Sequence, residues 1–153
     1  MILGLVGFLV LAVLAWIRLA PDDPAAWNLA SKAHVMALED PGHQTLPDAM
    51  AALGTANPAQ VGCVVPGAPA DVLARLDAIA LASPRTQRLA GSPQEGRITW
   101  VQRSFLMGYP DYITAEADAV PGGTRLDVIS RQRYGSGDMG VNAARLKDWL
   151  GQL

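Results

Sequence analysis

The residues with the most evident chemical potential lie near the end of the chain, where arginines alternate along a predicted strand. Arg131 and Arg133 share one face of that strand, and Arg103 of an earlier predicted strand joins them if the two strands pair in the required register. Guanidinium groups bind carboxylates and phosphates through paired hydrogen bonds. The pattern therefore predicts an anion-binding patch.

The same arginines could instead hold the fold together. Acidic residues such as Asp111, Asp127 and Asp138 are available as partners, and an Arg–Asp lattice would fasten the loop at 109–112 to the last helix. The sequence leaves both interpretations open. Both use the same candidates, which are Arg103, Tyr109, Asp111, Arg131, Arg133, Asp138, Asn142 and Arg145.

A glycine-rich turn at residues 135–138 precedes the last predicted helix. Such a turn can present backbone N–H groups to a phosphate. It lacks the lysine and the spacing of a Walker loop, and Asp138 already places negative charge there. The turn is therefore better explained as a helix cap.

Residues typical of catalysis are scarce. Residues 68–153 contain no histidine, and no serine there follows a nucleophile-elbow pattern. His34 and His43 match no metal-ligand spacing, and Cys63 is the only cysteine. We predict no catalytic residue, metal or cofactor, and keep a hydrolase or isomerase of unfamiliar design as the least favoured alternative.

The charge balance argues against nucleic acid as a partner. The chain has 153 residues, of which 12 are Lys or Arg and 14 are Asp or Glu. No basic run is present that could follow a phosphate backbone.

Residues 1–20 are apolar except for Arg18, and at 1.5 Å per residue they would span about 30 Å, the thickness of a bilayer core. We predict a transmembrane anchor, with Trp16 and Arg18 at the membrane interface. A cleaved secretory signal is the alternative, but no basic residue precedes the apolar run.

Residues 21–67 are rich in proline and alanine and predict a tether. A short helix there would have Asp23 as its N-cap and Pro24 as its first residue, with Trp27 on one face. A second candidate helix covers residues 47–53.

Residues 68–153 predict an α+β domain with an antiparallel four-stranded sheet and two helices packed on one face. Along the third strand, small apolar residues such as Ala115 and Ala117 alternate with polar ones and should lie under the helices, which leaves the arginines on the other face. The predicted helices are 69–82 and the segment that follows Asp138, and the strands are 86–90, 97–105, 112–120 and 124–134.

Four segments in this region resemble the bacterial and plastid family called domain of unknown function 1499. They are Arg97 to Ser104, Gly108-Tyr109-Pro110-Asp111-Tyr112, Ser130-Arg131-Gln132-Arg133 and Gly137 to Arg145. The chain also resembles the alphaproteobacterial subgroup that begins with a membrane segment and a short proline-rich tether. Many relatives carry a cysteine pair ahead of the domain, where this chain has Cys63 alone. The resemblance implies an architecture and a periplasmic domain on a bacterial inner-membrane anchor, but no activity.

The leading functional hypothesis is a non-enzymatic, membrane-anchored module that binds an anionic small molecule, a lipid headgroup or a partner protein through the arginine-bearing sheet face. The alternative is a structural accessory subunit or assembly factor of a membrane complex. In both hypotheses, residues 1–20 bind the lipid bilayer.

Overall fold

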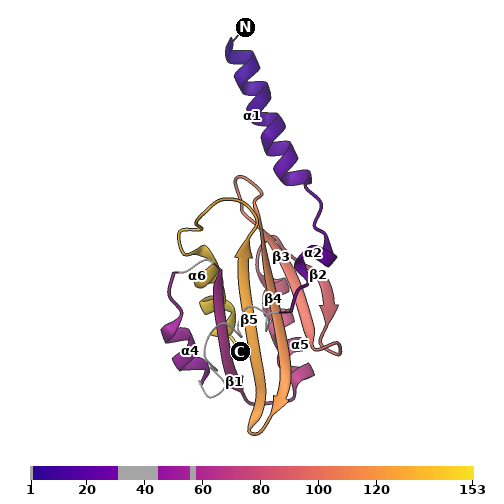
Figure 1. Ribbon diagram of the computed structural model, residues 1–153, viewed down its shortest axis with the longest axis vertical. Coiled ribbons are helices and arrows are strands. Elements are labelled where there is room, and N and C mark those ends of the chain that lie inside the picture. The colour runs from indigo at the N-terminus through magenta and orange to yellow at the C-terminus, as the bar shows by residue number, and fades with distance from the viewer. Residues whose placement is uncertain (1, 31–44, 56–57) are drawn as a thin grey trace.

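The computed structural model describes residues 2–30, 45–55 and 58–153. Figure 1 shows helix α1 projecting away from one end of a sheet, around which the other elements gather. In chain order the elements are α1 (Ile2–Leu19), α2 (Pro24–Trp27), α4 (Leu46–Ala52), β1 (Ala59–Val65), α5 (Pro69–Ala82), β2 (Thr86–Ser92), β3 (Arg97–Arg103), β4 (Pro110–Val120), β5 (Gly123–Gln132) and α6 (Val141–Leu150).

The strands form one antiparallel sheet in the order β1-β5-β4-β3-β2. The prediction of four strands is therefore wrong, because the sheet has five. The additional strand, β1, lies within the segment predicted as a tether. Its residues alternate between buried and half-buried, but they are small, and Pro58 and Pro66 flank them. Prolines at the ends of an edge strand do not interrupt its pairing, so here they mark the strand rather than a loop.

Helices α5 and α6 pack against one face of the sheet, as the α+β prediction requires. Leu73 and Leu76 of α5 and Leu146 of α6 are fully buried in this core. Ala115 and Ala117 of β4 belong to the same core, where their small side chains allow the helices to approach closely. The ring of Trp100 meets that of Trp149 edge-on at 5.7 Å between centroids.

The two short helices begin near their predicted starts. Asp23 caps α2 by accepting a hydrogen bond from the backbone N–H of Ala25 at 2.9 Å, with Pro24 at the first helical position. Helix α4 begins and ends one residue earlier than the predicted helix 47–53. His34 and His43 lie outside the described residues.

The prediction of a transmembrane span finds no support. Within the part of the chain that the structure describes, no helix is long and apolar enough to cross a membrane. Helix α1 has 18 residues.

Candidate functional site

The predicted arginine face exists, and the chain itself lies across it. Thr99 and Thr114, on neighbouring strands, share the face opposite the helices, and their hydroxyls lie 2.9 Å apart. Residues 20–28, which we call the strap, run from the end of α1 over this face. Figure 1 shows α2, part of the strap, in front of the sheet. The three predicted arginines of this face all bind the strap.

Asp22 is the acidic contact of the strap. One carboxylate oxygen accepts a hydrogen bond from the Tyr112 hydroxyl at 2.6 Å, and the other accepts from Arg103 at 2.7 Å. Arg133 donates to the Tyr112 hydroxyl at 3.2 Å and to the carbonyl of Pro21 at 2.8 Å. Burial, together with the bond to Asp22, raises the pKa of Tyr112 to about 12. This phenol therefore acts as a donor at neutral pH.

Trp27 is the aromatic contact of the strap. Its ring stacks on that of Tyr112 with 3.8 Å between centroids and 9° between planes. The guanidinium carbon of Arg131 lies 5.6 Å from the centroid of the Trp27 ring, and Arg131 also donates to the Trp27 carbonyl at 2.9 Å. The next residue, Asn28, accepts a hydrogen bond from Thr99 at 2.9 Å.

Arg131 is the least satisfied of these arginines. Among the described residues its buried Nε has no hydrogen-bond partner, and desolvation lowers its pKa. The lattice hypothesis offered Asp127 as a partner, but Asp127 instead accepts from Arg125 at 3.0 Å.

A second polar cluster lies on the opposite face, beneath α6. Arg145 donates to Asp111 at 2.8 Å and to Ser130 at 2.9 Å, and its guanidinium also reaches the side-chain oxygens of Gln102 and Asn142, both at 2.5 Å. Burial raises the pKa of Asp111, and the effect outweighs the opposing pull of Arg145. This cluster fastens α6 to the end of the sheet, and its Asp111–Arg145 ion pair joins the 109–112 segment to the last helix.

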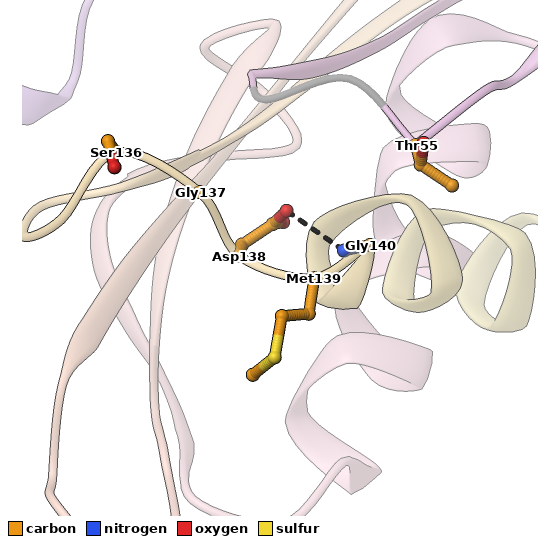
Figure 2. A pocket seen from close by; sticks show the side chains of 6 residues that line it. All are labelled: Thr55, Ser136, Gly137, Asp138, Met139 and Gly140. Atoms are coloured by element: carbon orange, nitrogen blue, oxygen red, sulfur yellow. Dashed lines mark hydrogen bonds between the residues drawn. The ribbon is translucent and has the colours of Figure 1, made fainter.

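Asp138 caps α6 from a position before the helix. Its carboxylate accepts from the backbone N–H groups of Gly140 at 3.1 Å and Asn142 at 2.7 Å. Burial alone would raise the pKa of Asp138, but these bonds hold it below its ordinary value. A shallow pocket lies beside this turn, and Figure 2 shows the Asp138 carboxylate directed at Gly140 within it. The pocket is lined by Thr55, Ser136, Gly137, Asp138, Met139 and Gly140.

The three tyrosines of the chain fall into two groups. Tyr112 lies under the strap, whereas Tyr109 and Tyr134 meet at 6.1 Å between ring centroids near the end of the sheet. Trp16 of α1 joins them, 5.7 Å from Tyr134.

The sheet thus separates six of the eight candidate residues into two groups. Three arginines face the strap, while Asp111, Asn142 and Arg145 lie on the helix-covered side. The sequence did not identify Asp22 and Trp27 as partners of the sheet face. Both lie in a proline-rich segment, and no local sequence pattern relates that segment to a strand about ninety positions later. Within the described ranges no group of three or more His, Cys, Asp or Glu side chains is placed to hold a metal ion.

One known family matches most of the chain, and the match includes the strap. The family described as "Protein of unknown function (DUF1499)" matches residues 17–153. The chain belongs to this family. The DUF1499 match begins before the strap, so it includes both Asp22 and Trp27 along with the sheet they cover. No curated protein and no solved structure matches the chain.

Proposed function

We propose that this DUF1499 protein is a non-enzymatic, membrane-anchored accessory module, in which the strap fixes an apolar helix to the α+β domain. The observation that carries the proposal is the apolar surface that α1 exposes. Among its side chains, Phe8 is 68% exposed and Leu11 67% exposed. A helix that is apolar on all sides is stable in an apolar environment, such as lipid or other membrane helices.

The end of α1 packs closely on the domain. This packing supports an accessory module of fixed orientation rather than a domain on a loose tether. Ile17 in the last turn of α1 and Ala20, the first residue of the strap, are 5% and 8% exposed. Arg18 donates to the Leu106 carbonyl at 2.6 Å. Gly108 lies so close to the Arg18 stem that an added Cβ would be 2.7 Å from its Cγ. A module built this way holds its domain in one orientation on the membrane.

Insertion of α1 is part of the proposal, whether or not the helix reaches the far leaflet. Its 18 residues would extend about 27 Å at 1.5 Å per residue. We further propose that the chain belongs to the alphaproteobacterial, membrane-anchored subgroup and that its domain lies on the periplasmic side of the inner membrane. The resemblance to that subgroup is the basis of this assignment, together with the apolar character of residues 1–20.

The arginine face is the basis of a second candidate function. A small anion, a lipid headgroup or an acidic partner could bind there by displacing the strap. The observation in its favour is the buried Nε of Arg131, which has no partner among the described residues. We place this candidate second because Asp22 already supplies the carboxylate that a ligand would otherwise present to Arg103.

The proposal is tested by flotation of the full-length protein with phosphatidylcholine vesicles. The double variant Phe8→Asp/Leu11→Asp should lose flotation, because two charges on α1 oppose its insertion. Leu81→Asp is the matched control, since Leu81 is also exposed, at 45%, but lies on α5. Equal flotation of the double variant and wild type would contradict insertion of α1.

The accessory role is tested by exchanging residues 2–16 for an unrelated apolar helix. If α1 packs against other membrane helices, the exchanged protein should lose partners that the wild type retains on gentle solubilisation. The ligand candidate predicts instead that anions raise the melting temperature of the wild type but not of Arg131→Gln.

A further inference from the structure

We propose that the end of the domain beside α1 is a second membrane-contacting surface, which binds anionic phospholipid headgroups. The surface, which we call the interface end, consists of Arg85, Phe105, Leu106, Tyr109 and Tyr134. The inference rests on the proposed insertion of α1 and adds a partner for a part of the domain outside the arginine face.

The tip of the interface end is apolar. Phe105 and Leu106 follow each other in the loop between β3 and β4 and are 78% and 74% exposed. Adjacent large apolar side chains at a loop tip are unfavourable in water unless something covers them. In Figure 1 this loop reaches the level of the last turn of α1. An inserted α1 would therefore bring the loop to the membrane surface.

The loop is fixed to α1 rather than merely near it. The guanidinium of Arg18 donates to the carbonyl of Leu106. Arginine at the end of an inserted helix places its charge at headgroup depth. Leu106 must then lie at that depth as well.

Aromatic rings continue the interface end toward the helix. Trp16, Tyr134 and Tyr109 form a row with 5.7 Å and 6.1 Å between successive ring centroids. The row draws on three segments, α1 and the loops that follow β3 and β5. Trp and Tyr are enriched at headgroup depth, where one end of each ring can stay hydrated.

The charges at this end favour an anionic surface. The guanidinium carbon of Arg85, an exposed residue, lies 5.5 Å from the Phe105 ring, and that of Arg133 lies 5.2 Å from the Tyr134 ring. The carboxylates at this end already have partners, since Asp111 binds Arg145 and Asp138 binds the start of α6. Arginines near a membrane surface attract anionic lipids.

The order of these groups argues for a bilayer rather than a protein partner. The apolar side chains of the loop tip, the aromatic rings and the arginines all lie beside the base of α1. A bilayer requires this arrangement, with apolar groups at the edge of the hydrocarbon and with rings and charges in the headgroup layer.

The test uses full-length protein reconstituted into vesicles of phosphatidylcholine with phosphatidylglycerol. Leu106→Cys can be labelled selectively with an environment-sensitive fluorophore, because the native Cys63 is 1% exposed. Ala119→Cys is the control, since Ala119 is exposed near the β4–β5 turn, at the opposite end of the sheet in Figure 1. Lipids that carry a nitroxide near the headgroup quench only fluorophores that lie in the interface.

The label at Leu106→Cys should lose emission to the nitroxide lipids, and the label at Ala119→Cys should not. Equal and weak quenching of both labels, in protein that still floats with the vesicles, would overturn the inference and leave the insertion of α1 standing. Protein that does not float would overturn both.

A second variant tests the charge. Arg85→Gln should reduce quenching of the Leu106→Cys label on the anionic vesicles and have little effect on pure phosphatidylcholine. If Arg85→Gln leaves the quenching of the Leu106→Cys label unchanged on both kinds of vesicle, the proposed binding of anionic headgroups is contradicted. If quenching of Leu106→Cys appears only after a second protein is added, the surface is a protein-docking site and the proposal is overturned.

Discussion

The ring of Trp27 stacks on the ring of Tyr112, with their centroids 3.8 Å apart and their planes at 9°. One ring comes from the segment after α1 and the other from the middle strand of the sheet. Tyr112 is fully buried although it lies on the face opposite α5 and α6. The strap therefore covers this face, and the DUF1499 domain includes a segment that precedes its first strand.

Replacing Trp27 should loosen the strap and destabilise the domain. Trp27→Ala removes the stack on Tyr112 and uncovers Arg131, so we expect a loss of about 2 kcal/mol in the free energy of unfolding, less than for a fully buried tryptophan. Urea unfolding in detergent would measure it. Limited proteolysis should also cut the strap of Trp27→Ala faster than that of the wild type.

Trp16→Ala is the matched control for this prediction, because Trp16 is 64% exposed and belongs to α1. It should leave unfolding of the domain nearly unchanged. Unchanged stability and protease resistance in Trp27→Ala would show that the strap does not hold the sheet face.

Asp22→Asn should weaken the strap through its charge alone. The carboxylate accepts from Arg103 and from Tyr112, and hydrogen bonds to charged groups contribute about 1.5–3 kcal/mol when they are well shielded. Asp22 is only partly buried, so we expect a loss of about 1 kcal/mol. Glu95→Gln, in the exposed β2–β3 turn, is the control of equal charge change. If Glu95→Gln lowered the free energy of unfolding as much as Asp22→Asn does, the change in net charge rather than the strap would explain the loss.

Arg145→Met should be the most destabilising of these changes, because it leaves the half-buried Asp111 carboxylate without its counterion. A broken buried pair costs about 3 kcal/mol or more, whereas Arg75→Met, at an exposed position of α5, should cost little. The double variant Asp111→Asn/Arg145→Met should recover part of the loss, since no uncompensated charge remains. No recovery would mean that Ser130 and Asn142, rather than Asp111, make Arg145 important.

Local patterns predicted most of the domain. The helix over 69–82 has the predicted bounds, because Pro69 at its first turn and Ser83-Pro84 at its end are strong boundary signals. The alternation along β4 placed Ala115 and Ala117 under the helices and Tyr112 on the other face, as observed. Strand β1 was missed, because its small residues gave no clear period between two prolines.

The candidate residues were predicted individually, but their grouping was not. Arg103 and Arg131 share a face because strands β3, β4 and β5 pair in the register that this grouping needed, and Arg145 binds Asp111 on the other face. The partners of Arg103 and Arg131 come from the strap, and no alternation or spacing within the sheet reveals a contact with a segment so distant in sequence. The covered state of the arginine face could therefore be learned only from the structure.

The domain should lose stability at alkaline pH, and Cys63 should account for part of the loss. Burial raises the pKa of this thiol from 9.0 to about 12, and nearby Asp127 adds to the effect. Below pH 9 the folded and unfolded states both keep the proton, so the thiol has no effect on stability. Above pH 9 the unfolded thiol ionises first, and stability falls until the pH passes the folded pKa.

Urea unfolding at about pH 8 and about pH 10.5 would measure this effect. Over that interval Cys63 should account for a loss of about 2 kcal/mol, which Cys63→Ala should remove. Tyr112 contributes a smaller loss of the same sign, because its pKa rises from 10.0 to about 12, and that part should persist in Cys63→Ala. An equal alkaline loss in wild type and Cys63→Ala would show that the thiol ionises as readily in the folded domain as in the unfolded chain.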